Sequence, residues 1–113
     1  PTAAGTPSGS PTEVSSANRA YFLAWNDATA KANLVGLHNS NAAGSTNTTS
    51  LSLDGVGIGN SISHYMLAAN VSQAVSVAAQ VTPSEGLHYF GFPGSVNGNT
   101  GVWWAAVGGS VWN

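Results

Sequence analysis

The side chains that could do acid–base chemistry in this chain are few and widely spaced. It has four acidic residues, and two of them, Asp27 and Asp54, lie at the ends of predicted strands. Two carboxyl groups a few ångströms apart across a cleft would suit a glycosidase. However, Asn26-Asp27 and Asp54-Gly55 are ordinary turn-forming pairs, and a chain this short rarely encloses a deep cleft. We therefore interpret both aspartates as turn residues and expect no enzyme.

The three histidines, His38, His64 and His88, form no local metal-binding motif. No two of them have the i, i+4 or His-x-His spacing, and the chain contains no cysteine. There is no Gly-x-Ser-x-Gly motif, and the glycine-rich residues 55–60 lack the spacing of a phosphate-binding loop. We expect no metal and no other cofactor.

The adjacent tryptophans Trp103 and Trp104 give the best indication of a binding site. Neighbouring strand residues face opposite sides, so one ring enters the core of a two-layer sandwich and the other faces outward. An outward tryptophan suits a ligand or a partner, and the C–H face of a sugar ring stacks well on it. The alternative is that the outward ring packs in an oligomer interface. The side chains predicted to bind sugar hydroxyls nearby are Asn97, Asn99, Thr100, His88 and Tyr89.

Charge is nearly absent: two basic and four acidic residues give a net charge of −2. An ordinary soluble domain is about one-quarter charged. The surface must therefore be covered by Ser, Thr, Asn and Gly, which suits neutral glycans or other copies of the chain. Two basic residues cannot form a phosphate-binding surface, so we exclude nucleic acid and electrostatic membrane binding. No run of about 18 apolar residues occurs, so no membrane span is expected.

The composition indicates a secreted or extracellular protein. Lys and Glu are scarcer than in ordinary cytosolic chains, and Asn47 and Asn70 each begin an N-x-S/T sequon. Such sequons also arise by chance in a chain rich in Asn, Ser and Thr. No signal peptide is visible, so we expect the sequence to represent a mature form.

The elements that would hold these side chains are predicted to be strands. Alternating or β-branched residues mark seven segments: 20–25, 32–38, 48–54, 62–68, 71–81, 87–92 and 102–107. Residues 71–81 also fit a helical spacing, but their valines favour a strand. Residues 20–25 are apolar on both faces, which predicts a central strand buried on both sides. We expect residues 55–60 to form a turn, residues 93–101 a loop, and residues 110–113 a short edge strand.

Short strands about 8–12 residues apart, with Gly, Pro and Asn between them, are typical of a sandwich or barrel. The predicted fold is all-β: an antiparallel β-sandwich, immunoglobulin-like or jelly-roll-like, with about seven to eight short strands. The prolines and glycines of residues 1–17 predict an extended N-terminal arm, flexible or ordered by a partner. Residues 18–113 would form a single domain. A small core with few charges and four tryptophans predicts a homo-oligomer.

Two short segments resemble the fungal immunomodulatory proteins. Residues 21–27 (YFLAWND) are similar to the first strand of that family, and Val111-Trp112-Asn113 is similar to its last residues. The resemblance covers about ten residues and implies a cysteine-free, dimeric, immunoglobulin-like sandwich that binds sugar. The charged central strands of the family have no counterpart here, and the family lacks a proline-rich arm. We therefore do not assign the chain to this family.

Two functions share the predicted fold. The first is a secreted, non-catalytic, lectin-like protein that recognises neutral sugars through aromatic stacking and hydrogen bonds from Asn, Ser and Thr. The second is a self-assembling structural subunit, such as a surface filament or coat protein, built by β-strand association. Low charge favours the second because it removes the repulsion that keeps sheets apart. The two functions differ in whether the outward tryptophan contacts a sugar or another subunit.

Overall fold

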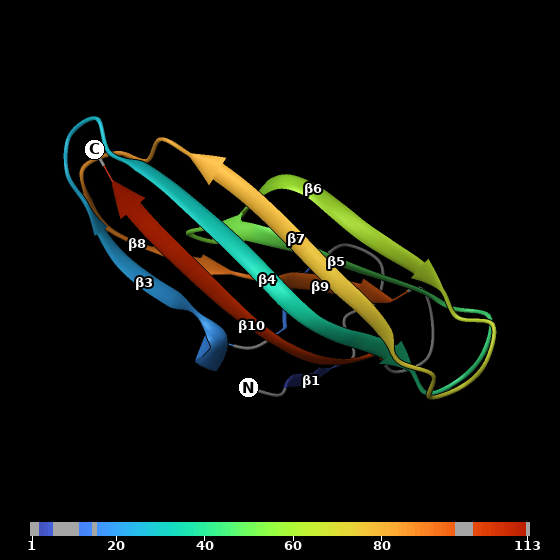
Figure 1. Cartoon of the computed structure of the whole chain (residues 1–113). Coiled ribbons are helices and arrows are strands. Elements are labelled where there is room, and N and C mark those ends of the chain that lie inside the picture. Colours follow the sequence, from blue (N-terminus) through green and yellow to red (C-terminus); the bar gives the residue numbers. More distant parts are fainter. Residues whose placement is uncertain (1–2, 6–11, 15, 97–100, 113) are drawn as a thin grey trace.

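The structure, a computed structural model, describes residues 3–5, 12–14, 16–96 and 101–112. These residues form ten strands and one 3₁₀ turn, η1 (Ser16–Asn18). Every strand pairing among them is antiparallel. The strands form two sheets that face each other (Figure 1), which confirms the all-β, antiparallel prediction. The molecule is elongated, with extents of 47 × 21 × 19 Å.

The first sheet has four strands and lies in front in Figure 1. In spatial order they are β1 (Ala3–Gly5), β10 (Gly101–Trp112), β4 (Thr29–Ser40) and β7 (Gln73–Val81). Strands β4 and β10 are paired along their whole lengths, from Trp112 opposite Thr29 to Gly101 opposite Ser40. β7 confirms the prediction of a strand where a helical spacing was also present.

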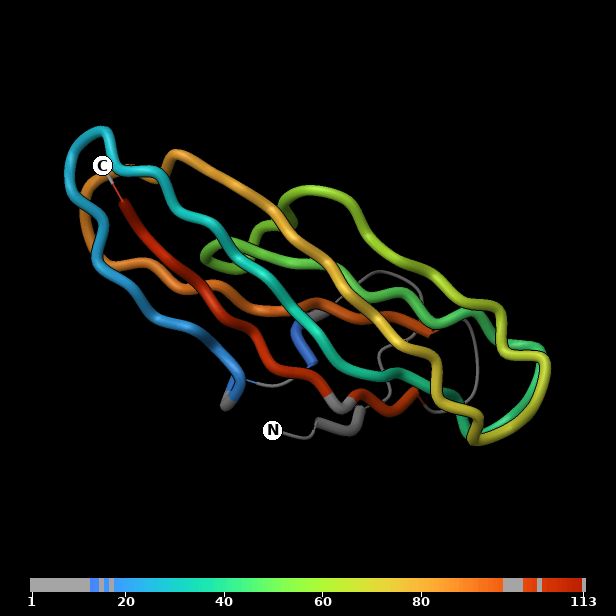
Figure 2. Tube along the Cα trace, viewed as in Figure 1, coloured from blue at the N-terminus to red at the C-terminus, as the bar shows by residue number. Residues whose placement is uncertain are grey.

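The second sheet lies behind the first, as the chain trace in Figure 2 also shows. Five of its strands follow one another in the spatial order β2 (Thr12–Glu13), β9 (Pro93–Val96), β5 (Thr46–Leu53), β8 (Gly86–Gly91) and β3 (Ala20–Ala24). A sixth strand, β6 (Val56–Tyr65), also pairs with β5 but does not belong to this linear order.

The apolar core lies between the two sheets. Because side chains alternate along a strand, β4 buries Ala30, Ala32 and Leu34 and exposes the residues between them. The second sheet contributes the rings of Phe90 and Phe92, which are fully buried. The described residues contain no helix that is long and apolar enough to cross a membrane.

The prediction that residues 20–25 form a central, doubly buried strand is wrong. Among the described strands, β3 is the last of its sheet and pairs only with β8. Its outward residues Tyr21 and Leu23 are 60% and 66% exposed. An apolar pattern on both faces shows what a strand could bury, but its neighbours in the sheet decide what it does bury.

The predicted glycine-rich turn is also shorter than expected. Only Asp54 and Gly55 form the turn, with φ of 51° and 87°, and β6 begins at Val56. Gly57 and Gly59 are therefore strand residues. Residues 93–96, predicted to be loop, form β9, and residues 110–112 continue β10 rather than forming a separate edge strand. The structure thus has more strands than the seven to eight predicted.

The described parts of residues 1–17 contribute to both sheets. β1 pairs with β10, and β2 pairs with β9. Glu13 of β2 is also held by Arg19 through two hydrogen bonds of 2.8 Å. The predicted division into an arm and a single domain at residues 17 and 18 stays a prediction.

Candidate functional site

Trp103 belongs to the core. Its ring is fully buried, and its Nε1–H donates a 2.8 Å hydrogen bond to Thr49 Oγ1. Two glycines make room for it, since a Cβ on Gly94 or Gly101 would lie 2.7 or 2.5 Å from a ring carbon. A ring without accessible surface cannot stack on a ligand. The structure therefore removes Trp103 from the predicted sugar-binding residues.

The backbone of Trp104 pairs with Leu37 on β4. Its side chain lies outside the part of the chain that the structure describes, and so do Asn97, Asn99 and Thr100. Their predicted roles as ligand contacts stay predictions.

His88 is buried and already bonded at both ring nitrogens. Its Nδ1 lies 2.5 Å from Asp54 Oδ2, and its Nε2 lies 2.6 Å from the carbonyl oxygen of Ser84. An ionised carboxylate and a carbonyl can only accept hydrogen bonds, so these two contacts favour the imidazolium form of His88, in which both nitrogens donate. The hydrogen bond to Asp54, followed by the one to Ser84, raises the pKa of His88. His88 thus holds the β5–β6 turn to β8 and has no nitrogen left for a ligand.

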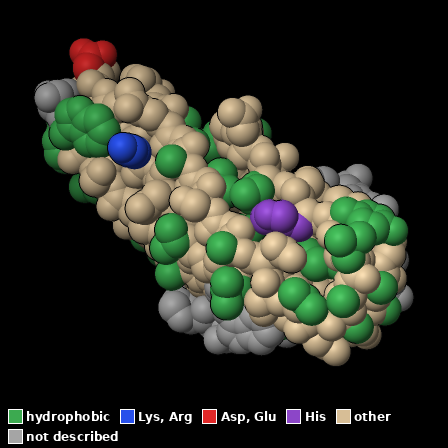
Figure 3. All heavy atoms as spheres, turned by 45° about the vertical axis from the view of Figure 1, so that its right-hand side comes forward, with side chains coloured by type: hydrophobic (Ala, Val, Ile, Leu, Met, Phe, Trp, Pro, Cys, Tyr) green, Lys and Arg blue, Asp and Glu red, His purple; other side chains and the backbone are tan. Residues whose placement is uncertain are grey.

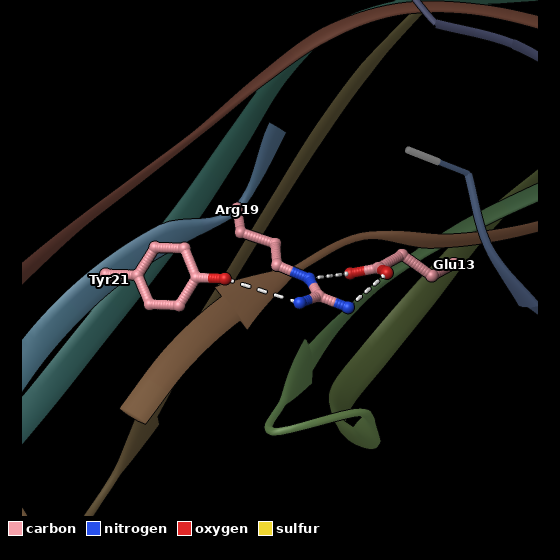
Figure 4. A network of polar contacts seen from close by, with 3 residues as sticks. All are labelled: Glu13, Arg19 and Tyr21. Atoms are coloured by element: carbon pink, nitrogen blue, oxygen red, sulfur yellow. Dashed lines mark hydrogen bonds and ion pairs between the residues drawn. The ribbon is translucent and has the colours of Figure 1, made fainter. Parts of the chain in front are cut away.

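Tyr89 points to the opposite face of β8 and belongs to an aromatic and ionic cluster. Its ring centroid lies 5.6 Å from that of Tyr21, and the guanidinium of Arg19 lies 4.2 Å above its ring. Arg19 also donates to both carboxylate oxygens of Glu13 and to the Tyr21 hydroxyl (Figure 4). The cation covers one face of Tyr89, so this cluster chiefly fixes η1 and β2 against β8. The structure therefore does not bring Trp103, His88 and Tyr89 into one site.

A different feature provides a candidate site: a hollow of about 340 Å³ on the outer face of the first sheet, between β4 and β10. We call it the β4–β10 hollow, and its lining residues are Lys31, Ala32, Asn33, Gly109 and Ser110. Figure 3 shows a mostly uncharged and polar surface, with the basic colour confined to one small area beside hydrophobic side chains.

Two consecutive glycines of β10 lie at this hollow, and they face opposite sides of the sheet. Gly108 lies opposite the outward Asn33, so no side chain from β10 covers the outer face at that position, whereas Gly109 lies opposite the buried Ala32. A Cβ on Gly108 would lie 2.9 Å from Asn33 Oδ1, and one on Gly109 would lie 2.9 Å from the Phe90 ring in the core. Glycine inside a strand often marks a place where another group approaches closely.

Three polar side chains are available at the hollow. Lys31, Asn33 and Ser110 are exposed, and none of them has a side-chain hydrogen bond or ion pair to another described residue. Lys31 lies opposite Ser110 on β10 and opposite Gln80 on β7, so these three polar residues form a row across the sheet. Such groups can donate to and accept from a bound hydroxyl.

An exposed tryptophan lies beside this row. Trp112 follows Ser110 by two residues, so strand alternation places both on the outer face of the sheet. Its side chain is 43% exposed. The outer face of β10 therefore carries an exposed aromatic ring two residues beyond a residue that lines the hollow.

The sequence itself carries a signal for this site. Gly108-Gly109 interrupts a strong strand pattern, and Ser110 and Trp112 follow with the two-residue spacing of one face.

A buried polar chain links the two sheets elsewhere. His38 Nδ1 lies 2.9 Å from Thr49 Oγ1, and His38 Nε2 lies 2.7 Å from His64 Nδ1. Burial, with a smaller contribution from His64, lowers the pKa of His38 to about 4, so His38 is neutral at neutral pH. No group of three or more His, Asp or Glu residues is placed to hold a metal ion within the described ranges. The hydrogen bonds of His38 to Thr49 and His64 therefore join the two sheets.

Comparisons with known proteins give one informative likeness. No protein-family model matches the chain, and no curated protein matches it. Among solved structures, it is similar to one described as "EclA C-terminal domain; sugar-binding protein", with a TM-score of 0.54 and 14% sequence identity. The match covers 91% of this chain and 72% of the other. At this identity, the likeness establishes a shared β fold.

Proposed function

We propose that this protein is a non-catalytic carbohydrate-binding protein that binds a glycan at the β4–β10 hollow. The observation that carries the proposal is that Ser110, which lines this hollow, and the exposed Trp112 are two residues apart on the same face of β10. A sugar ring has flat C–H faces and hydroxyl groups at its rim, so it needs both kinds of surface side by side.

The proposed contacts follow from the chemistry of each group. The ring of Trp112 stacks on the sugar, while Asn33 and Ser110 exchange hydrogen bonds with hydroxyl groups. The absence of a side chain at Gly108, on the outer face, lets the sugar approach the backbone. These contacts suit neutral sugar hydroxyls and ring faces, as the low charge of the chain predicts.

The likeness of fold supports the same ligand class. The similar solved structure is described as a sugar-binding protein, and we extend this class of ligand to the present chain as part of the proposal. Secretion and homo-oligomerisation are further parts of it, because a largely uncharged, polar surface suits an extracellular protein that presents several copies of one site.

The proposal includes no catalysis. Asp27 and Asp54, the carboxylates considered as a glycosidase pair, both have positive φ, 63° and 51°, which is typical of turn residues. Asp54 is further occupied by His88 and by the backbone N–H of Tyr89. Both aspartates are therefore explained by turn structure.

A glycan array probed with the parent protein and with Trp112→Ala tests the proposal. We expect the substitution to remove most of the binding signal, because aromatic anchors usually dominate such sites. Tyr65→Ala is the matched control, since Tyr65 is also an exposed aromatic strand residue, 59% exposed, but lies on β6 of the other sheet. Absence of glycan binding by the parent, or equal losses in the two variants, would contradict the proposal.

A second candidate function, the self-assembling structural subunit, is favoured by the exposed apolar surface of β3 and β8. Leu23 and Leu87 lie opposite each other and are 66% and 69% exposed, beside the edge of β3 that pairs with no other described strand. Electron microscopy distinguishes the two functions, because this candidate requires an open polymer whereas a lectin forms a closed oligomer.

A further inference from the structure

We infer that the β4–β10 hollow takes a saccharide carrying one anionic substituent, a carboxylate or a sulfate, which binds beside Lys31. This inference rests on the proposed function and adds a charged group to the neutral contacts given above. Its basis is the position of Lys31, one of the two basic residues in the chain, and its lack of an ion-pair partner among the residues that the structure describes.

The two basic residues are used differently. The guanidinium of Arg19 is held by both oxygens of Glu13 at 2.8 Å and lies over Tyr89. Lys31 is exposed and forms no ion pair with any residue that the structure describes. Lys31 is therefore the cation that an incoming anion can pair with.

A structural role for Lys31 does not explain its position. Lysine often protects the exposed edge of a sheet from pairing with another chain. Lys31 instead lies on β4, which has β10 on one side and β7 on the other. At this position, a lysine offers no protection to an edge.

The neighbours of Lys31 on the outer face favour an anion. Across the sheet it lies between Ser110 and Gln80, and along its own strand the next outward residue is Asn33. All three are uncharged and can donate hydrogen bonds to a carboxylate or sulfate. The remaining carboxylates on elements near this end, Asp27 and Glu85, lie in the turns beyond β4 and β7 rather than in the lining of the hollow.

The size of the effect follows from the exposure of the site. An exposed pair of a lysine and a carboxylate contributes modestly, so we expect an anionic saccharide to bind about two- to five-fold more tightly than its neutral counterpart. Stacking on Trp112 would contribute equally to both ligands. The preference should weaken at high salt, because salt screens exposed charges.

The test is a glycan array in which each neutral oligosaccharide is accompanied by a counterpart carrying one uronic acid or one sulfate. It is probed at low and at high salt with the parent protein, Lys31→Gln, Lys31→Arg and Trp112→Ala. We expect the parent and Lys31→Arg to prefer the anionic member at low salt, Lys31→Gln to bind both members equally, and Trp112→Ala to lose both. The uronic acid and sulfate arms show which anion is preferred.

The outcomes separate this inference from the proposed function. If the parent binds neutral glycans through Trp112 without any preference for the anionic member, the proposed function stands and the inference is wrong. A preference that persists in Lys31→Gln also overturns the inference, because the anion would then be bound elsewhere. If no glycan binds, both are wrong.

Discussion

At the scale of single residues, the pair formed by His88 and Asp54 makes stability depend on pH. Its hydrogen bonds raise the pKa of His88 above its ordinary value of 6.5. Partial burial pushes the pKa of Asp54 upward, but hydrogen bonds from His88 and from the Tyr89 amide outweigh burial, so this pKa is lowered. Because the pKa of His88 is higher in the folded protein than in the unfolded chain, its protonation stabilises the fold. This stabilisation is fully present below pH 6.5 and is lost as the pH rises through the pKa of the folded state.

We therefore expect His88→Gln to remove stability at pH 6 and to cost less as the pH rises above the folded pKa of His88. The measurement is urea denaturation of the parent and the variant over this range, compared at each pH. Asp54→Asn is the companion variant, because it removes the charge that raises the histidine pKa. A difference in unfolding free energy that does not change with pH would show that His88 is not an imidazolium in the folded protein.

The buried ring of Trp103 gives the second prediction at this scale. Trp103→Ala should lower the free energy of unfolding by about 3–5 kcal/mol, because it removes a large core side chain and leaves a cavity. Trp103→Phe keeps a ring but loses the N–H that donates to Thr49. The lost hydrogen bond costs about 1 kcal/mol of unfolding free energy, in addition to the cost of replacing the indole by a smaller ring. Chemical denaturation measures both. If Trp103→Ala is as stable as the parent, the register of β10 is wrong.

At the scale of elements, the two glycines of β10 should respond differently to substitution. Gly109→Ala places a Cβ 2.9 Å from the Phe90 ring, so the core must shift, at a cost of about 1–3 kcal/mol. Gly108→Ala meets only the flexible end of Asn33, which can move aside. We expect Gly108→Ala to be nearly as stable as the parent but to bind glycans less well. Thermal denaturation and the glycan array measure the two effects, and equal stabilities would contradict this assignment of faces.

The edge strand β3 carries the prediction of self-association. Tyr21 and Leu23 expose apolar surface beside an edge that has no pairing partner among the described strands. Leu23→Lys should weaken association, because a charge on an edge strand opposes pairing with a second sheet. Light scattering at micromolar concentration checks the mass of both proteins, with Val56→Lys as a control on exposed β6. A parent protein that is monomeric contradicts the prediction.

At the scale of the whole molecule, the fold distinguishes between the two sequons. Asn47 is fully buried and donates to the carbonyl oxygen of Asn39, whereas Asn70 is exposed in the connection between β6 and β7. In a eukaryotic secretory host, we expect a glycan on Asn70 and none on Asn47. Mass spectrometry of the parent and of Asn70→Gln checks this, and a glycan found on Asn47 would show that modification precedes folding there.

The sequence by itself determined the local features of this protein. Alternation along the chain predicted most strands and the all-β class, because a strand's two faces follow from neighbouring residues alone. For the same reason, it predicted that one ring of the pair Trp103-Trp104 enters the core. The low charge, visible in composition alone, also indicated a surface suited to sugars.

Only the tertiary structure decided which strands are neighbours and which residues meet. β3 lies at an edge although its sequence is apolar on both faces, because pairing with distant β8 sets its place. Lys31 and Ser110 line one hollow only because β4 and β10 pair along their full lengths. Such pairings depend on the free energy of the whole sandwich, in which register and strand order are chosen together, so no local pattern can specify them.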